Sequence, residues 1–192
     1  RPYDSARDGF ALGEGAAFVV MEDEDVAVRR GAHILAYVDG YGSTFSRSAV
    51  VQPRANEFDA GRAMQKALIK WDLTLQGEVD VIFGTGGGGA LDVVEAKAID
   101  RVWGPNKDRL WLTSIKGSVG HTLGASGAMS LVAAVYCLQA GLIPPTLGLR
   151  ELDPQCAGID VVTGDVRRLR GTKAMVNAFG LGHHASVIIS RA

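Results

Sequence analysis

The chain has 192 residues, with 20 Lys or Arg against 21 Asp or Glu, and its formal net charge of -1 argues against binding nucleic acid through a basic surface. Hydrophobic residues make up 47% and charged residues 21%, which is ordinary globular composition and excludes a disordered chain. Glycine is in excess, at 25 residues, where average usage of about 7% would give about half as many. The length predicts a single domain, in which these glycines need an explanation.

The composition also bears on location. The longest apolar stretch, at 128–138, is shorter than the roughly 18 residues that span a bilayer, so we expect no membrane protein. The two cysteines, Cys137 and Cys156, form neither a metal-spaced pair nor a disulfide framework, which favours a reducing cytoplasm. The chain opens at Arg1 inside a phrase that reads as structured, which predicts one half of a larger unit.

In chain order, the first half reads as short strands and helices. Residues 16–21 are a continuous apolar run and predict a buried strand, and the acidic-then-basic run 22–30 predicts a short helix. Residues 33–41 predict a second strand, followed by a polar loop through Pro53. Residues 58–71 place apolar side chains three and four apart, which is typical of one helical face.

The second half alternates more regularly between strands and helices. Residues 79–83 predict a buried strand, which runs into a glycine cluster and then a helix at 91–103. Residues 110–115 predict another buried strand. The helix predicted at 123–140 is apolar nearly all round, so we expect it in the middle of a core. The tail predicts strands at 158–162, 174–179 and 185–190.

This order of elements predicts the fold class. Strands that alternate with helices and are apolar on both faces indicate an α/β layered fold. The closing pair of strands adds an antiparallel element, which gives a mixed sheet with helices on both faces. No linker or low-complexity segment divides the chain, so we expect one compact unit.

The first of three glycine-bearing sites lies between a predicted strand and a predicted helix. Gly84, Gly86 and Gly89 fit the G-x-G-x-x-G fingerprint of a dinucleotide site. The acidic residue that should end the next strand is missing, since that strand ends at Lys116. Two interpretations stay open: a nucleotide-binding module on the loop at 84–89, or a loop whose glycines let a backbone or ligand approach closely.

The second site places Lys116 and His121 five residues apart at a strand-to-helix junction. We expect the imidazole of His121 in the interior, beside helix N-terminal amides that disfavour its charged form. That environment suits a neutral hydrogen-bond donor to a carbonyl oxygen. A helix-capping histidine is the alternative, but a lysine beside it favours a pocket.

The third site is the glycine-hinged turn that starts at Asn177 and precedes His183 and His184. Adjacent residues on a strand point to opposite faces, so these two histidines are poorly placed to share a metal ion. We therefore predict no metal site. Taken alone, the segment is typical of a tight turn.

Together these phrases resemble the C-terminal half of the β-ketoacyl-[acyl-carrier-protein] synthases, a branch of the thiolase-like fold. The phrases RPYD, RDGF and GEG at 1–15 look like the family's opening motif. Lys116 with Gly120 and His121 matches its second-histidine motif, and NAFGLG at 177–182 matches its closing turn. The resemblance covers the whole chain and implies that residues 1–192 are the C-terminal domain of a two-part fold, whose N-terminal half this chain does not include.

The resemblance also implies a chemistry. In that family a nucleophilic Cys holds an acyl chain, and two His assist decarboxylation of a malonyl unit on its carrier protein. That Cys belongs to the N-terminal half, so neither Cys137 nor Cys156 is expected to be the nucleophile. Where the family carries its first catalytic His, in an HGTGT phrase, this sequence reads FGTGGGG, and our register puts Thr85 in its place. A threonine hydroxyl cannot replace an imidazole at neutral pH, so condensation should be lost or badly impaired.

This departure favours a chain-length factor, the β-subunit of the ketosynthase of type II polyketide synthases. Such subunits lack the catalytic set, pair with an active ketosynthase and shape the tunnel that holds the growing chain. The alternatives are the C-terminal half of an active synthase and, more remotely, the nucleotide-binding module. On the favoured interpretation Lys116 and His121 are a catalytic remnant, and the acyl tunnel is lined by Thr85, Asn177, Phe179, Gly180 and Leu181.

The resemblance further implies the partners. They are a ketosynthase subunit in a heterodimer, the N-terminal half of the fold, and an acyl carrier protein whose phosphopantetheine carries the substrate. We expect no cofactor of the chain's own, no nucleic acid and no membrane, and a cytoplasmic location.

Overall fold

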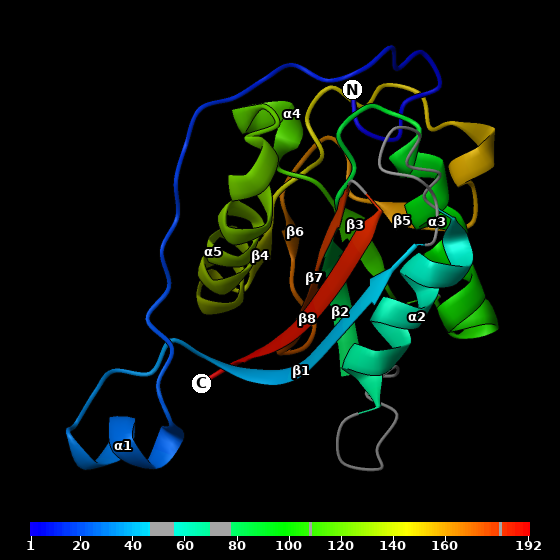
Figure 1. The fold of residues 1–192 in the computed structure, drawn as a ribbon. Coiled ribbons are helices and arrows are strands. Elements are labelled where there is room, and N and C mark those ends of the chain that lie inside the picture. The colour runs from blue at the N-terminus through cyan, green and yellow to red at the C-terminus, as the bar shows by residue number, and fades with distance from the viewer. Residues whose placement is uncertain (47–55, 70–77, 108, 181) are drawn as a thin grey trace.

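The structure is a computed structural model that describes residues 1–46, 56–69, 78–107, 109–180 and 182–192. Its centre is a six-stranded mixed sheet of order β1-β8-β7-β2-β3-β5 (Figure 1). Strands β7, β2, β3 and β5 are parallel to one another, and β8 is antiparallel to both β7 and β1. The strands are β1 (Ala36–Phe45), β2 (Val79–Phe83), β3 (Trp111–Thr113), β5 (Asp160–Val161), β7 (Lys173–Gly180) and β8 (His183–Arg191), and β4 (Leu142–Ile143) pairs separately with β6 (Arg167–Arg168).

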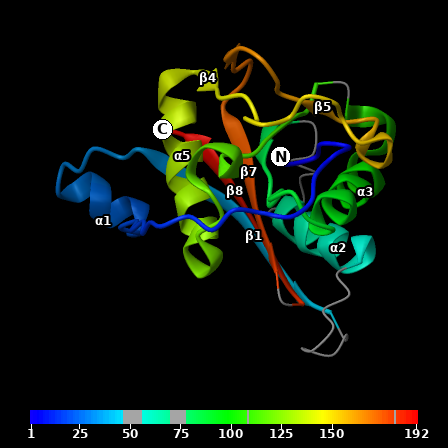
Figure 2. The same ribbon diagram turned by 90° about the horizontal axis from the view of Figure 1, so that it is seen from above.

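Helices cover both faces of this sheet. Helices α2 and α3 lie on one face and α5 on the other (Figures 1 and 2). Alternate residues of β2 serve the two layers: Ile82 joins the core beneath α2 and α3, whereas Val81 and Phe83 join the core beneath α5. The predicted α/β fold with a mixed sheet is thus confirmed. The helices are α1 (Glu24–Arg29), α2 (Glu57–Leu68), α3 (Leu91–Trp103), α4 (Lys116–Val119) and α5 (Ser126–Ala140), with short 3-10 turns at Gly104–Lys107, Leu123–Ala125 and Pro154–Cys156.

Helix α2 shows how the sequence periodicity builds the first layer. Its N-terminus is capped by Asn56, whose side chain accepts a hydrogen bond from the N–H of Asp59. The apolar stripe predicted from the spacing faces the sheet and α3. Trp71, predicted at the end of this helix, lies outside the described residues. The buried residues of the stripe are Ala60, Ala63, Met64, Ala67 and Leu68.

Most other predicted elements are present with shifted ends. The strand predicted at 33–41 begins and ends later, so Ser43, Thr44 and Phe45 belong to β1. Most of the loop predicted after it lies outside the described residues. The strand predicted at 110–115 is only three residues long because the chain turns at Ser114 into α4. The helix predicted from residue 123 begins with a 3-10 turn and is α-helical from Ser126.

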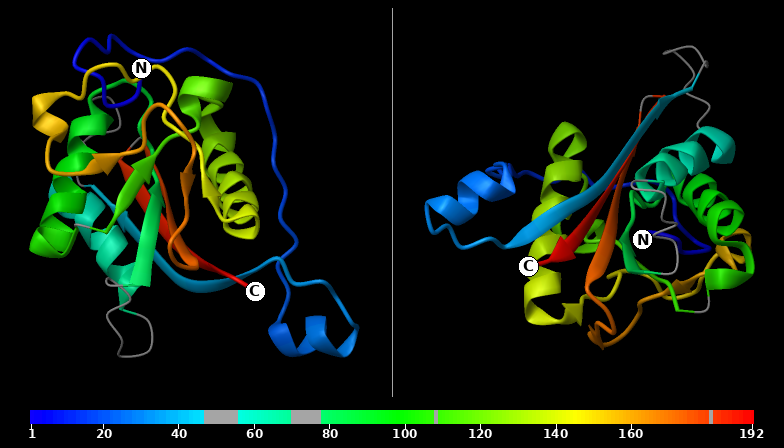
Figure 3. Two further views of the ribbon diagram at one scale, coloured as in Figure 1. Left: turned by 180° about the vertical axis from the view of Figure 1, so that it is seen from behind. Right: turned by 90° about the horizontal axis from the view of Figure 1, so that it is seen from below.

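The strand predicted at 16–21 is wrong. This segment lies extended on the surface, with Phe18 and Val20 each 92% exposed, and it forms no ladder with the described residues. A strand needs a neighbour for its backbone groups and a cover for its apolar side chains, and the described chain provides neither. Residues 9–22, which we call the strap, cross one end of the sheet and descend beside α5 to α1, which stands apart from both layers (Figure 3).

The prediction that the apolar helix lies in the middle of a core is also wrong for this chain. Only Ser130, Ala134 and Leu138 of α5 are buried, and Tyr136 on another face is 70% exposed. By length and composition alone, the 18 residues Leu123–Ala140 suffice to cross a membrane, a test that core helices of soluble proteins also pass. This window is longer than the apolar stretch at 128–138 because it also includes Ser126 and Gln139.

Candidate functional site

The candidate site lies at the carboxyl ends of the parallel strands β2, β3 and β7. Strand β2 leads into residues 84–89, which we call the glycine loop; β3 leads to Lys116; and β7 ends at Gly180. Parallel strands end on one edge of a sheet, so the three sites found separately in the sequence come together there. The strap begins over this edge, where the N–H of Gly9 donates to the carbonyl of Gly88 at 3.0 Å.

His121 is fixed by its neighbours in one orientation. Its backbone N–H donates to the carbonyl of Ala11 at 2.8 Å, and its ring lies 4.8 Å from the ring of Phe10, centroid to centroid. Its Nδ1 accepts a hydrogen bond from the N–H of Leu123 at 3.0 Å and lies 3.0 Å from the hydroxyl of Ser126. Because Nδ1 is an acceptor, a neutral imidazole carries its proton on Nε2 and presents Nε2–H as a donor.

The electrostatics of the site favour that neutral form. Burial lowers the pKa of His121, and the charge of Lys116 lowers it further. Burial also lowers the pKa of Lys116, against the opposing effect of the carboxylates of Glu95 and Asp92. These directions agree with the neutral donor expected from the sequence. One detail differs, since His121 is half-buried at the edge of the described chain and not in its interior.

Gly87 is the residue of the glycine loop that faces Lys116 and His121. A Cβ atom added at Gly87 would lie 3.1 Å from Cδ2 of His121 and 3.5 Å from Cδ of Lys116. Thr85, which our register aligns with the family's first catalytic His, is bound elsewhere: its hydroxyl accepts a hydrogen bond from the N–H of Phe179 at 2.9 Å. The loop therefore presents bare backbone to the pair.

Two buried carboxylates at the start of α3 hold the glycine loop in this shape. Glu95 accepts hydrogen bonds from the N–H groups of Thr85 and Gly86, and Asp92 accepts from the next two N–H groups. Such amides would cradle a phosphate in a nucleotide site. Here the protein's own carboxylates occupy them, which argues against the nucleotide-binding alternative.

The sequence interpretation missed Tyr3, Asp92 and Glu95. All three side chains are buried at 0% exposure, and the hydroxyl of Tyr3 donates to Glu95 at 2.7 Å. The sequence held a signal for the two acids, which lie three residues apart on the helical face that also buries Ala96 and Ile99. Carboxylates on an apolar face need partners, and here these come from the glycine loop and the N-terminus.

Asn177, predicted at the tunnel, braces Glu95. Its amide nitrogen donates to a carboxylate oxygen of Glu95 at 2.9 Å, and its carbonyl oxygen accepts from the hydroxyl of Ser186 at 2.8 Å. Both ends of this buried side chain therefore point at protein partners.

The other residues of the closing turn divide between core and surface. Phe179 is buried and its ring meets the ring of His184 edge-on at 5.2 Å. Gly180 borders open space, since a Cβ added there would meet nothing within 4 Å. Leu181 lies outside the described residues. His184 is buried and His183 exposed, so the two imidazoles lie on opposite faces, as the strand geometry predicted.

The two thiols are poor nucleophiles in this structure. Burial raises the pKa of both Cys137 and Cys156 to about 11. At pH 8 about a thousandth of each is the reactive thiolate. We expect both to react with Ellman's reagent at least about tenfold more slowly in the native protein than in urea, with the sites assigned by peptide mass spectrometry. Fast labelling of either thiol in the native protein would contradict this.

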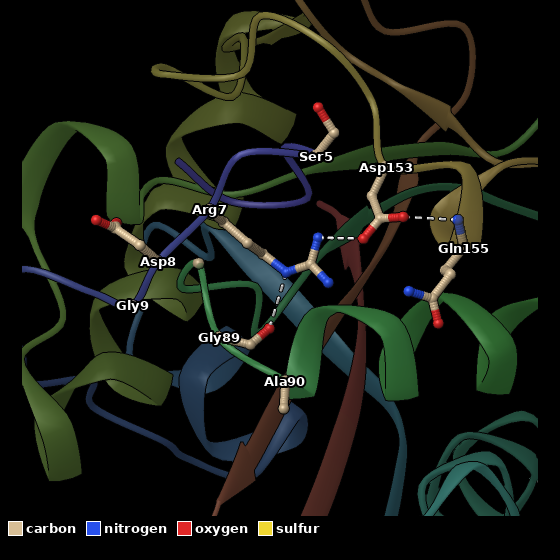
Figure 4. A pocket seen from close by; sticks show the side chains of 9 residues that line it. Ser5, Arg7, Asp8, Gly9, Gly89, Ala90, Asp153 and Gln155 are labelled. Carbon is tan, nitrogen blue, oxygen red and sulfur yellow. Dashed lines mark hydrogen bonds and ion pairs between the residues drawn. The ribbon is translucent and has the colours of Figure 1, made fainter.

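A cavity of about 500 Å³ adjoins the outer side of the glycine loop (Figure 4). Its cation is Arg7, whose Nε donates to the carbonyl of Gly89 at 3.2 Å and whose guanidinium forms an ion pair with Asp153. Because this charge is already paired, the cavity offers no free cation to an anionic ligand. Its lining is Ser5, Arg7, Asp8, Gly9, Gly88, Gly89, Ala90, Asp153 and Gln155.

Comparison with known proteins identifies relatives of the whole chain. The family model "Beta-ketoacyl synthase, C-terminal domain" matches residues 35–150. The 3-oxoacyl-[acyl-carrier-protein] synthase 2 of Rhizobium meliloti (strain 1021) is 36% identical over 192 residues, which are 100% of this chain and 45% of the relative. The chain thus spans a little under half the length of this curated relative.

Solved structures show the same fold. The ishigamide ketosynthase/chain length factor matches with a TM-score of 0.89 and 33% identity, over 100% of this chain and 47% of that one. A second structure, of a type II polyketide synthase acyl carrier protein in complex with its ketosynthase, contains a chain that matches with a TM-score of 0.91 and 25% identity. The match covers 100% of this chain and 47% of that one. The resemblance seen in the sequence is confirmed, and the chain belongs to the β-ketoacyl synthase family, whose C-terminal domain it carries.

Proposed function

We propose that the chain is part of a chain-length-factor subunit, which pairs with a ketosynthase in type II polyketide or fatty-acid-like synthesis and shapes the acyl tunnel without catalysing condensation. One observation carries the proposal. The glycine loop, in which the family resemblance implies a first catalytic His at Thr85, brings only the bare backbone of Gly87 to Lys116 and His121. With a single histidine at the site, the catalytic set is incomplete.

The retained pair supports a binding role at this position. The Nε2–H of a neutral His121 and the ammonium group of Lys116 are both donors, and Nζ of Lys116 makes no hydrogen bond with the described residues. Two donors beside a glycine-lined loop suit a carbonyl or carboxylate oxygen of an acyl group on a carrier protein. They can orient such a group without the second imidazole that decarboxylation requires.

Exposed apolar surface supports the proposed partners. The strap carries Phe18, Val20 and Met21 at 72–92% exposure, and α5 leaves Tyr136 uncovered. Patches of this kind mark interfaces. We assign their cover to the N-terminal half of the same fold, because the curated relative above is more than twice as long as the match. The ketosynthase and the acyl carrier protein would act on that assembled unit, in a cytoplasm that keeps the free cysteines reduced.

The test is condensation by the assembled subunit, including its N-terminal half, with malonyl-carrier protein and an acyl donor. Without the ketosynthase we expect no turnover above background, and with it we expect product whose chain length changes when tunnel residues such as Phe179 are altered. Product formation can be followed by mass spectrometry of the carrier-bound chain. Sustained turnover by the subunit alone would overturn the proposal.

The alternative is an active β-ketoacyl synthase whose nucleophile lies in the N-terminal half. The observation that favours it is the intact placement of His121 and Lys116 at one site. This alternative predicts covalent labelling by a Cys-directed condensing-enzyme inhibitor and loss of turnover in His121→Gln. A chain-length factor stays unlabelled, and its ketosynthase partner takes the label.

A further inference from the structure

Tyr3 occupies a strained position that the proposed function does not use. Its φ of 60° lies in the left-handed region, which a bulky residue rarely adopts because the backbone is strained there. Its backbone is fixed on both sides, since its N–H donates to Asp92 at 2.6 Å and its carbonyl accepts from the N–H of Asp153 at 2.9 Å. Backbone strain of this kind is common at functional sites, so it indicates a functional role for Tyr3.

The hydroxyl of Tyr3 has one fixed direction. It accepts a hydrogen bond from the N–H of Gly86 at 3.1 Å, and its own proton goes to Oε2 of Glu95 at 2.7 Å. The ring also fills the space beside the loop. A Cβ added at Gly84 would lie 2.1 Å from the hydroxyl oxygen, and one at Gly86 would lie 2.2 Å from Cζ. The glycine loop is therefore moulded around this one side chain.

The contacts of Glu95 specify its ionised form. It accepts four hydrogen bonds, from the N–H groups of Thr85 and Gly86, the amide of Asn177 and the hydroxyl of Tyr3. Every partner supplies a proton, so a protonated carboxyl would set its own O–H against a donor. Burial raises the pKa of Glu95, and the donors oppose that rise.

From Glu95 the effect reaches the candidate site through charge. The carboxylate of Glu95 favours the ammonium form of Lys116, and that ammonium favours the neutral form of His121. Two other titratable groups interact with this cluster through charge. Asp92, on the first turn of α3, raises the pKa of Lys116, and Cys156, in the turn that follows Asp153, has its pKa raised by Glu95. Neither donates to Glu95.

We propose that Tyr3 is a positioning residue for the pair Lys116 and His121: its hydroxyl orients Glu95 and holds it as a carboxylate, which keeps Lys116 the cation and His121 the neutral Nε2–H donor. This role follows from contacts within the chain. It holds for a chain-length factor and for an active synthase alike, so its failure would leave the proposed function standing.

The test is the NMR titration of His121 in the purified protein with isotope-labelled histidine, with the signal assigned from His121→Gln. Tyr3→Phe keeps the ring but removes one hydrogen-bond donor to Glu95. The ionised form of Glu95 is then less favoured, and the ammonium form of Lys116 is less favoured in turn. We expect the pKa of His121 to rise by about half a pH unit or more. The control Tyr41→Phe alters an exposed tyrosine on β1 and should leave that titration unchanged.

A second background separates this role from a structural one. Lys116→Met should by itself raise the pKa of His121, because it removes the neighbouring cation. In that background, Tyr3→Phe should add no further rise. The proposal is overturned if the pKa of His121 is unchanged in Tyr3→Phe, or if Tyr3→Phe raises it equally with and without Lys116. It is also overturned if Lys116→Met does not raise that pKa, a result that does not depend on Tyr3→Phe folding.

Discussion

Replacing Glu95 by alanine should lower the free energy of unfolding by about 3–5 kcal/mol, the range seen when one partner of a buried charge network is removed. The substitution leaves three buried donors without their acceptor: the N–H of Thr85, the amide of Asn177 and the hydroxyl of Tyr3. The N–H of Gly86 keeps the hydroxyl of Tyr3 as an acceptor. Each unsatisfied group costs about 1–3 kcal/mol. Urea denaturation of the purified protein, followed by circular dichroism, measures the loss.

Two further variants are controls for Glu95→Ala. Glu151→Ala removes an exposed carboxylate and should change the stability by no more than about 0.5 kcal/mol. Glu95→Gln keeps the shape but turns an NH₂ group toward the donors, so it should remain clearly destabilising. A loss below about 1 kcal/mol in Glu95→Ala would mean that other acceptors replace the carboxylate and that Glu95 does not hold the glycine loop.

The sequence predicted best the elements whose own residues carry a clear pattern. The strand at 79–83 and the helix at 91–103 have the predicted ends, because each carries its own periodicity and a glycine follows the helix. Lys116 and His121 were found from residue type and spacing. The shape of the glycine loop was not predicted, because it is set by Tyr3, more than 80 residues away in sequence.

The two wrong predictions share a physical cause. Residues 16–21 read as a buried strand and 123–140 as a central helix because their side chains are apolar on every face. Such a pattern indicates that the segment is buried, but it does not identify the part of the protein that buries it. In the described chain the strap is mostly exposed, and α5 is buried along one face only and leaves Tyr136 exposed. Sequence patterning thus identified surfaces that the proposed N-terminal half would bury.

Gly86→Ala should destabilise the protein by about 3 kcal/mol or more, at the upper end of the overpacking range. The new Cβ would lie 2.2 Å from Cζ of Tyr3, and the backbone cannot move away from it. The N–H of Gly86 is held by Glu95 and Tyr3, and its carbonyl accepts from the hydroxyl of Ser114 at 2.6 Å. Thermal and urea unfolding measure the effect.

The loop supplies its own control in Gly89, where an added Cβ would meet nothing within 4 Å. Gly89→Ala should be neutral or stabilise by up to about 1 kcal/mol, because alanine reduces the freedom of the unfolded chain. The clash at Gly86 is with one ring, so Tyr3→Leu and Gly86→Ala together should cost less than the sum of their separate losses. Additive losses would show that the two residues act independently, and that the ring of Tyr3 does not shape the glycine loop.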